Sequence, residues 1–574
     1  MKKKYVGAIF IILINSFFCY NSSAQNDKTT WFRDAKFGIF IHWGLYSQIG
    51  YTEWCQNHFE MQADDYTSLA KTFNPIKYDA NAWASLVKAS GAKYCIITSK
   101  HHEGFSMYDT RYSDYSIMHT PYKKDVLRMF AIALKKEKIN FGIYYSVMDW
   151  HHPDYLPRRY FDNRAASAAN IANYKSFFKN QVGELIDKYQ PKLMWFDGEW
   201  ENTHDSLETF DVVNMMRSKQ PDILFNNRLS RFSHGDFRTP ENTVPATGLK
   251  DERGRPLVWE VCHTINDSWG YDPFSNEFLS ERDLIRMLID IVSKGGNLLL
   301  NIGPRPDGSI QTEFVERLNG MGKWLSKNGE SIYGTDASIF PNLPFYGRST
   351  TKGNKIFLHV FMQPKNGILS VPMLKNKIVK AYTLVDLKPL DYKIENNHIQ
   401  ISLPKNSFDV NAHVIVIETS EKPEIANVLP IYPVENTIEL NCENGSIPIE
   451  NKGLEAEQYF DKMRIRKWTS KQNETWIEWK FETTKEQIFN IQINAANAFE
   501  RFGNAVFYLE IDEWLKEGQL IQREPWSFAN KYVYEGVTIN KITLKAGKHN
   551  IRFKVNLKAE QQIIFERIVF KPVN

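Results

Sequence analysis

Asp197 is the residue whose type and position most directly suggest chemistry. It follows the apolar run Leu193-Met-Trp-Phe196 and precedes Gly198. Such a run is typical of a short buried strand, and a parallel α/β barrel carries its catalytic groups at the carboxyl ends of its strands. Glycine lets the chain turn sharply and lets a ligand approach closely. The sequence therefore favours a reactive carboxylate here, with a helix-capping aspartate as the alternative.

Polar or aromatic side chains follow several other apolar runs in the same half of the chain. In a barrel the ends of these runs would meet at one mouth, so together they favour a shared site over separate structural roles. They are His42-Trp43-Gly44, Ser99 to Gly104 with His101 and His102, Tyr144-Tyr145-Ser146, Asn226-Asn227-Arg228 and Trp259-Glu260.

The elements that must position these residues alternate between apolar runs and amphipathic segments. This alternation indicates a parallel sheet. It favours a (β/α)8-like barrel over residues 25–335, with one element missed or irregular. The predicted strands are 37–42, 94–99, 141–146, 193–197, 223–227, 258–262 and 297–302, and the clearest helices are 82–89, 124–137, 173–189, 211–219 and 281–294.

The pattern changes beyond residue 335 to short strands separated by turns rich in Lys, Asn and Gly. We expect a β-sandwich over residues 336–420, a proline-containing linker over 421–440 and a second β-sandwich over 441–574. The predicted strands are 356–361, 368–371, 378–383, 398–403 and 413–418 in the first sandwich, and 476–481, 488–493, 506–511, 539–544, 551–555 and 563–570 in the second.

The N-terminus has the pattern of a signal peptide over residues 1–24. Lys2, Lys3 and Lys4 precede an apolar stretch too short to span a bilayer, and Ser22-Ser23-Ala24 is a small-residue cleavage site. Cys19 follows two phenylalanines, which fits a lipid-attachment box poorly. We expect an exported chain, periplasmic or secreted, with lipid anchoring through Cys19 as the less favoured alternative.

The composition excludes some partner classes. The formal net charge of +4 falls to +1 once the three N-terminal lysines are removed, so the chain has no electrostatic footprint for nucleic acid. No later apolar run is long enough for a transmembrane helix. Aromatic side chains make up 14% of the chain, which suits carbohydrate sites, because sugar C–H faces stack on rings, and equally suits β-sandwich cores.

Seven motifs of the chain resemble those of the α-L-fucosidases of glycoside hydrolase family 29. The resemblance spans roughly residues 28–420 and implies a retaining exo-glycosidase with a barrel and a following β-sandwich. Its substrate would be a fucosylated oligosaccharide or glycoconjugate. The motifs that carry it are Lys36-Phe-Gly-Ile-Phe-Ile-His-Trp-Gly44, Thr52-Glu-Trp54, Thr98-Ser-Lys-His-His-Glu-Gly-Phe105, Gly142-Ile-Tyr-Tyr-Ser146, Trp195-Phe-Asp-Gly198, Asn266-Asp-Ser-Trp-Gly-Tyr271 and Gly295-Gly-Asn-Leu-Leu-Leu-Asn-Ile-Gly-Pro304.

Retaining hydrolysis needs one carboxylate as nucleophile and a second carboxyl group that acts first as acid and then as base. The resemblance assigns the nucleophile to Asp197. Two residues compete for the acid/base role, because the family places this residue at varied positions. Glu241 lies on a loop that could bring a proton donor over the sugar, and Glu260 lies at a predicted strand end. We favour Glu241; the alternative for either residue is an ion pair with Arg228 or Arg238.

The resemblance also implies a set of substrate-binding residues. Fucose presents three adjacent hydroxyls and a methyl group, and neutral imidazole both donates and accepts hydrogen bonds. Strand alternation lets only one of Tyr144 and Tyr145 face inward, and Tyr144 is the residue we include. The expected set is His42, Glu53, Trp54, His101, His102, Tyr144, Trp195, Arg228 and Trp269.

Metal chemistry is not favoured. His42, His101, His102 and Asp197 show neither HxH nor HExxH spacing, and no cysteine pair shows CxxC spacing. We expect no cofactor for catalysis. The C-terminal domain, which opens with Glu455-Ala-Glu457, resembles β-sandwich carbohydrate-binding modules. That resemblance implies a structural calcium ion there; the alternative is a spacer or docking domain.

Two other functions remain open at the level of sequence. One is a non-catalytic carbohydrate-binding relative, which the presence of Asp197 with two candidate acids disfavours. The other is a glycosidase for a related galacto-configured sugar, because a methyl pocket rejects an added hydroxyl only weakly.

Overall fold

The computed structural model describes residues 27–573, apart from residues 246, 252, 396, 405–407, 427–430, 432–436, 443, 448–453, 455–456, 460–461, 484, 498–503 and 521–536. The predicted signal peptide, Cys19 and the middle of the predicted linker therefore lie outside the described residues. Within them, no helix combines the length and apolarity needed to cross a membrane.

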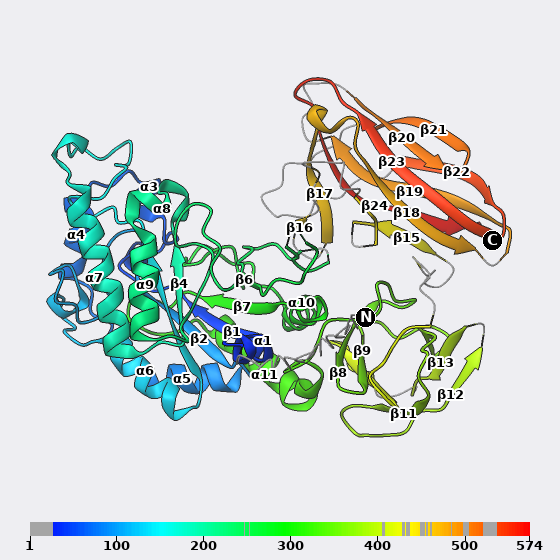
Figure 1. The fold of residues 1–574 in the computed structure, drawn as a ribbon, viewed down its shortest axis with the longest axis horizontal. Helices are drawn as coiled ribbons and strands as arrows, with labels where there is room; N and C mark the ends of the chain where they lie inside the picture. Colours follow the sequence, from blue (N-terminus) through cyan, green and yellow to red (C-terminus); the bar gives the residue numbers. More distant parts are fainter. Residues whose placement is uncertain are drawn as a thin grey trace, which may run out of the picture.

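A curved sheet of seven parallel strands forms the centre of the first domain (Figure 1). The strand order is β5-β4-β3-β2-β1-β7-β6, so neighbours in sequence are mostly neighbours in space. All seven predicted strands exist. They are β1 (Phe37–Ile41), β2 (Tyr94–Lys100), β3 (Asn140–Ser146), β4 (Leu193–Asp197), β5 (Leu224–Phe225), β6 (Glu260–Thr264) and β7 (Asn297–Ile302).

A short irregular segment, Phe237–Glu241, occupies the eighth position of the barrel. Isolated parallel bridges join Phe237 to Asn226 beyond β5 on one side, and Arg238 and Glu241 to Trp259 and Cys262 on the other. We call this segment the seam. It is the irregular element expected from the sequence, and it closes the seven-stranded sheet into a (β/α)8-like barrel.

Helices cover the outside of the barrel, and several begin at side-chain caps. Asp79, Asp125, Asn170 and Ser280 each accept a hydrogen bond from a backbone N–H in the first turn of the helix that follows. The main helices are α1 (Thr30–Ala35), α5 (Ala80–Ala89), α6 (Val126–Lys136), α7 (Ile171–Tyr189), α9 (Thr209–Lys219), α10 (Glu281–Ser293) and α11 (Thr312–Asn328), with short helices α2 (Tyr46–Ile49), α3 (Cys55–His58), α4 (Ala63–Thr67) and α8 (His204–Leu207). Of the main helices, α1 and α11 were not predicted.

Two small antiparallel sheets form the domain that follows. One has the order β10-β13-β12 and the other β11-β14-β9-β8. The five predicted strands exist, and β8 and β12 are additional. The strands are β8 (Gly347–Lys352), β9 (Lys355–Val360), β10 (Ile368–Pro372), β11 (Ile378–Thr383), β12 (Tyr392–Glu395), β13 (His398–Ser402) and β14 (His413–Thr419).

The first sandwich packs against the barrel through α10 and α11. The indole of Trp324 donates to the carbonyl oxygen of Ala412 at 3.1 Å, and Arg348 pairs with Asp290 of α10. Phe357, Tyr382 and Val416 belong to the same apolar cluster as the barrel interior. The two domains therefore meet through an apolar interface, while the interior of the sandwich, around Ile356, Leu358 and Ile415, is an apolar cluster of its own.

The C-terminal domain is a separate sandwich with its own apolar core (Figure 1). Its sheets have the orders β16-β17-β24-β19-β22, with β15 beside β24, and β18-β23-β20-β21. Residue 438, inside the predicted linker, already begins β15. The strands are β15 (Ile438–Asn441), β16 (Glu457–Tyr459), β17 (Lys462–Thr469), β18 (Trp476–Thr483), β19 (Gln487–Asn497), β20 (Ala505–Ile511), β21 (Trp514–Leu520), β22 (Val537–Leu544), β23 (Gly547–Asn556) and β24 (Gln562–Pro572).

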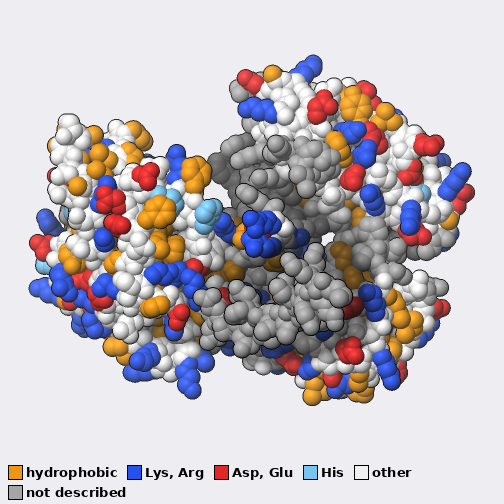
Figure 2. All heavy atoms as spheres, in the orientation of Figure 1, with side chains coloured by type: hydrophobic (Ala, Val, Ile, Leu, Met, Phe, Trp, Pro, Cys, Tyr) orange, Lys and Arg blue, Asp and Glu red, His pale blue; other side chains and the backbone are white. Residues whose placement is uncertain are grey.

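Charged side chains of both signs are interspersed over the face of the molecule shown in Figure 2. The cysteines of the described chain, Cys55, Cys95, Cys262 and Cys442, are buried free thiols. The calcium ion expected in the C-terminal domain stays a prediction.

Candidate active site

Asp197 lies at the carboxyl end of β4, where the chain turns through Gly198 at a φ of 88°. This φ is in the left-handed region that favours glycine. Two donors hold the carboxylate of Asp197: Nη1 of Arg228 lies 3.0 Å from Oδ1, and the hydroxyl of Tyr144 lies 3.1 Å from Oδ2. Nε2 of His102 lies 3.5 Å from Oδ2. The carboxylate is thus fixed in one orientation at the mouth of the barrel.

Glu241 shares the guanidinium group of Arg228 with Asp197. Oε2 of Glu241 lies 2.7 Å from Nη1, the same nitrogen that contacts Asp197, and the Glu241 side chain is 41% exposed. The ion pair with Arg228, which was the alternative to a catalytic role for Glu241, exists, and it is formed at the mouth. Because both oxygens contact the same nitrogen, the two carboxyl groups lie near each other at the mouth, as a pair that acts on one glycosidic bond requires.

Glu260 lies at the other end of the barrel. β6 begins at Glu260, whereas the sequence predicted a strand ending two residues beyond it, so this side chain is at the amino end of its strand. It is fully buried and accepts hydrogen bonds from the hydroxyl of Tyr94, the first residue of β2, and from the indole of Trp195 at 3.1 Å. Burial raises the pKa of Glu260 to about 8. The expected place of Glu260 at the mouth is therefore corrected.

His42, at the end of β1, has a tautomer set by its partner. The side-chain nitrogen of Asn301 donates to the carbonyl oxygen of Trp269 at 2.7 Å, so the amide oxygen of Asn301 faces Nδ1 of His42, 2.7 Å away. An amide oxygen only accepts, so Nδ1 carries the hydrogen and Nε2 presents a lone pair. Burial lowers the pKa of His42 to about 4, which keeps the ring neutral.

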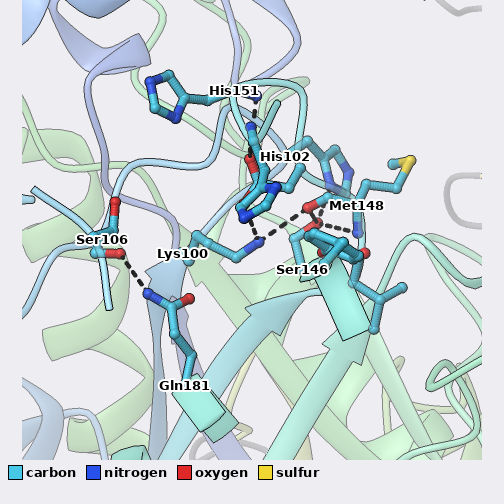
Figure 3. Close-up of polar contacts among 12 residues, drawn as sticks. Lys100, His102, Ser106, Ser146, Met148, His151 and Gln181 are labelled. Carbon is cyan, nitrogen blue, oxygen red and sulfur yellow. Dashed lines mark hydrogen bonds and ion pairs between the residues drawn. The ribbon is translucent and has the colours of Figure 1, made fainter. Parts of the chain in front are cut away.

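His102 is oriented by Ser146 at the end of β3 (Figure 3). The Ser146 oxygen lies 2.8 Å from the carbonyl oxygen of Met148 and 2.6 Å from Nδ1 of His102, and these contacts hold the ring in place. Nε2 of His102 is thereby directed at the carboxylate of Asp197. Burial lowers the pKa of His102 to about 3.

Tyr144 stands between two flat rings. His101 stacks on it with centroids 5.2 Å apart, and Trp195 with centroids 5.7 Å apart. Burial also lowers the pKa of His101 well below its usual value. Tyr145 points the other way, to Gln181 of α7, which in turn contacts Ser106 (Figure 3). The strand alternation thus brings Tyr144, and not Tyr145, to the site.

The remaining predicted residues separate into two groups. Glu53 is buried, accepts from the backbone N–H of Gly270 at 3.1 Å, and has its pKa raised by burial to about 7. Trp269 lies 5.1 Å from His42 and Trp54 lies 5.2 Å from His102, measured between ring centroids. Trp195 differs, because it is 2% exposed and lies between Tyr144 and the guanidinium of Arg228. It packs beneath the two residues that donate to Asp197 and so supports the site without being exposed to a ligand.

Three residues that orient the site were assigned no role from the sequence. Asn301 and Ser146 both stand at carboxyl ends of barrel strands, the position that singled out Asp197, and this signal could have found them. Lys100 was inside a quoted motif without a role. Its Nζ lies 2.9 Å from Asp149 and 3.2 Å from the carbonyl oxygen of Met148, which also accepts from Ser146 (Figure 3).

Replacing Lys100 by methionine is expected to lower the free energy of unfolding by about 3–5 kcal/mol, because it leaves the buried carboxylate of Asp149 without its charged partner. The Lys100 and Asp149 side chains are 0% and 2% exposed. Urea unfolding followed by tryptophan fluorescence measures the loss. Lys219→Met, which breaks an exposed pair with Asp187, should cost under about 1 kcal/mol. Adding Asp149→Asn should restore part of the stability; equal losses in Lys100→Met and Lys219→Met would contradict the prediction.

The site defines a class of protein. Two carboxyl groups share one guanidinium nitrogen at the mouth of a barrel, beside three histidines that burial keeps neutral. This is the arrangement of a glycoside hydrolase that works through two carboxylates.

The sequence family described as Alpha-L-fucosidase matches residues 19–330, more than half of the chain, and the chain belongs to this family. The α-L-fucosidase of Dictyostelium discoideum is 30% identical over 443 residues, which cover 71% of this chain and 92% of that protein. This agrees with the family that the motifs suggested.

Solved structures agree with this membership. α-L-Fucosidase isoenzyme 1 from Paenibacillus thiaminolyticus has a TM-score of 0.66 and 33% identity, covering 70% of this chain and all of its own. The enzyme from Bacteroides thetaiotaomicron, trapped as a covalent intermediate with 2-fluoro-fucosyl fluoride, has a TM-score of 0.63 and 30% identity, covering 69% and 96% of the two chains. A fucosidase from Vibrio, 23% identical with a TM-score of 0.77, shares the fold over 95% of this chain and 98% of its own.

Proposed function

We propose that this protein hydrolyses terminal α-linked L-fucose from glycans with retention of configuration, using Asp197 as nucleophile and Glu241 as acid/base. The observation that carries the proposal is the contact of both carboxyl groups with Nη1 of Arg228 at the barrel mouth. The covalent intermediate trapped in the Bacteroides relative supports a retaining mechanism.

In the first step the carboxylate of Asp197 attacks the anomeric carbon. The bond to the leaving oxygen breaks as Glu241 gives that oxygen a proton. In the second step Glu241 takes a proton from water, the water oxygen attacks the same carbon, and the ester to Asp197 breaks. Arg228 and Tyr144 donate to Asp197, which suits a group that leaves again as an anion.

Glu241 suits the acid/base role better than Glu260 for two reasons. The side chain of Glu241 is 41% exposed, so both a leaving group and a water molecule can reach it. Glu260 is fully buried at the opposite end of its strand, and its oxygens are occupied by Tyr94 and Trp195.

The histidines suit a ligand that presents hydroxyl groups. Nε2 of His42 offers a lone pair, so it accepts a hydrogen bond that a sugar hydroxyl donates. Glu53 and Trp269 flank the same space, and Trp269 offers a flat apolar face. We infer that His42, His101, His102, Glu53, Trp54 and Trp269 surround the fucosyl ring and that Trp195 supports it indirectly.

Two further proposals concern the ends of the chain. We infer export from the charged, apolar and small-residue pattern of residues 1–24. We also retain a carbohydrate-binding role for the C-terminal sandwich.

The test is hydrolysis of matched p-nitrophenyl glycosides by the wild-type protein, with the product followed by proton NMR. We expect cleavage of the α-L-fucoside with α-L-fucose as the first-formed sugar, and much slower cleavage of the α-L-galactoside, which differs from it only by a hydroxyl on C6. β-L-Fucose as first product would overturn retention. Faster cleavage of the galactoside would favour the galacto-configured alternative, and binding of fucose without cleavage of any fucoside would favour a non-catalytic relative.

A further inference from the structure

An exposed tryptophan stands beside the proposed nucleophile. Trp200 follows Asp197 by three residues in a turn, η4 (Glu199–Glu201), and its side chain is 39% exposed. It stacks on Trp54 with centroids 6.3 Å apart and an interplanar angle of 19°. Trp150 meets Trp54 edge-on at 5.2 Å. We call Trp54, Trp150 and Trp200 the aromatic platform.

The platform borders the site directly. The rings of Trp54 and Trp200 lie 5.2 and 6.0 Å from the ring of His102, whose Nε2 lies 3.5 Å from the carboxylate of Asp197. The histidines are buried whereas Trp200 is exposed, so Trp200 lies on the solvent side of the site.

One arginine holds the platform in place. Nη1 of Arg159 lies 2.8 Å from Glu201, next to Trp200, while Nε and Nη2 lie 2.8 and 2.6 Å from the side-chain oxygen of Asn57, three residues after Trp54. Its guanidinium carbon lies 5.7 Å from the ring of Trp54 and 5.3 Å from that of Trp150. Tyr155 also donates to Glu201 at 2.6 Å. Loops that follow β1, β3 and β4 are thereby tied together.

An exposed aromatic ring held this firmly is preorganised for a ligand, because little side-chain freedom remains to be lost on binding. The apolar faces of a pyranose ring pack on flat aromatic rings, whereas a small alcohol offers no such face. We propose that Trp200, backed by Trp54 and Trp150, binds the sugar ring that leaves with the glycosidic oxygen and makes the enzyme selective for fucose linked to another sugar. This rests on the proposed function.

The experiment compares Trp200→Ala with wild type on two kinds of substrate. α-L-Fucosyl fluoride carries no leaving-group ring, and a panel of fucosylated oligosaccharides does. We expect kcat/KM on the best oligosaccharide to fall about tenfold, the scale of one aromatic contact, while kcat/KM on the fluoride stays within about twofold. Trp200→Phe should recover most of the loss. Phe210→Ala, which removes an aromatic ring 63% exposed on α9, should change neither.

Equal losses on both substrates would mean that Trp200 only supports the site, and no loss on the oligosaccharides would exclude the platform. A wild-type protein that cleaves neither substrate kind would instead refute the proposed function. In that case lactose, a sugar of the leaving-group type without fucose, is titrated into the protein, and its binding is followed by tryptophan fluorescence. Weaker binding by Trp200→Ala than by wild type supports the platform, and equal binding overturns it.

Discussion

Replacement of Asp197 by alanine is expected to lower kcat/KM for an α-L-fucoside at least about 10³-fold, with the fold intact. The loss follows because alanine has no carboxylate that could attack the anomeric carbon. Initial rates on p-nitrophenyl α-L-fucoside measure it, and circular dichroism checks the fold. Asp205→Ala removes an exposed aspartate of α8, eight residues along the chain, and should leave the rate unchanged.

Azide makes the Asp197 prediction sharper. In Asp197→Ala the small anion can enter where the carboxylate was and attack the anomeric carbon as the leaving oxygen departs, giving β-L-fucosyl azide. Wild type treated with 2-fluoro-fucosyl fluoride should carry the label on the peptide that contains Asp197. A label elsewhere, or activity within tenfold of wild type in Asp197→Ala, would show that another residue is the nucleophile.

The second large effect is expected from Glu241→Ala. Hydrolysis of an oligosaccharide should slow by roughly 10²–10⁴-fold, the usual worth of general acid catalysis. Attack on α-L-fucosyl fluoride should suffer far less, because fluoride departs without a proton. Azide should then rescue turnover by attacking the fucosyl-Asp197 ester, giving α-L-fucosyl azide. The configuration of the azide product thus tells the two roles apart: the β-azide forms when the nucleophile is missing, and the α-azide forms when the acid/base is missing.

Two control variants test whether the loss in Glu241→Ala comes from the missing acid. Glu241→Gln retains an oxygen for Arg228 but no acid, so it should lose as much activity as Glu241→Ala. Glu260→Gln keeps the hydrogen bonds beneath the barrel and should stay within about tenfold of wild type on the same oligosaccharide. The reverse pattern, with the large loss and the azide rescue in Glu260→Gln, would make Glu260 the acid.

Much of the fold could be predicted because the barrel strands are continuous apolar runs. Leu193–Asp197 and Asn297–Ile302 have the predicted bounds. The helix α11 carries its own signal, with Phe314, Leu318, Met321 and Leu325 buried on one face, and was missed because the search followed the alternation of strands and helices. The position of the seam could not be predicted, because Phe237–Glu241 contains a proline and no apolar run and its pairing depends on its neighbours.

The candidate site was predictable to the extent that strand ends were placed correctly. Asp197 and His42 follow long apolar runs, so their strand ends are well marked. Glu260 follows a weak apolar run. The predicted strand began two residues too early, and this error placed Glu260 near the mouth of the barrel instead of at its opposite end. Asn301 and Ser146 act on other side chains rather than on a ligand, so a search for reactive residue types passes over them.

The seam and β4 hold the residues at their carboxyl ends to different degrees. Asp197 ends a strand bonded along its length, so an insertion before it would displace an entire ladder. Glu241 ends a segment joined by isolated bridges to Asn226 beyond β5 and to Trp259 and Cys262 at β6, where residues can be gained or lost without breaking a ladder. Asp197, the proposed nucleophile, is therefore fixed by its strand, whereas the segment that carries Glu241, the proposed proton donor, can tolerate a change of length.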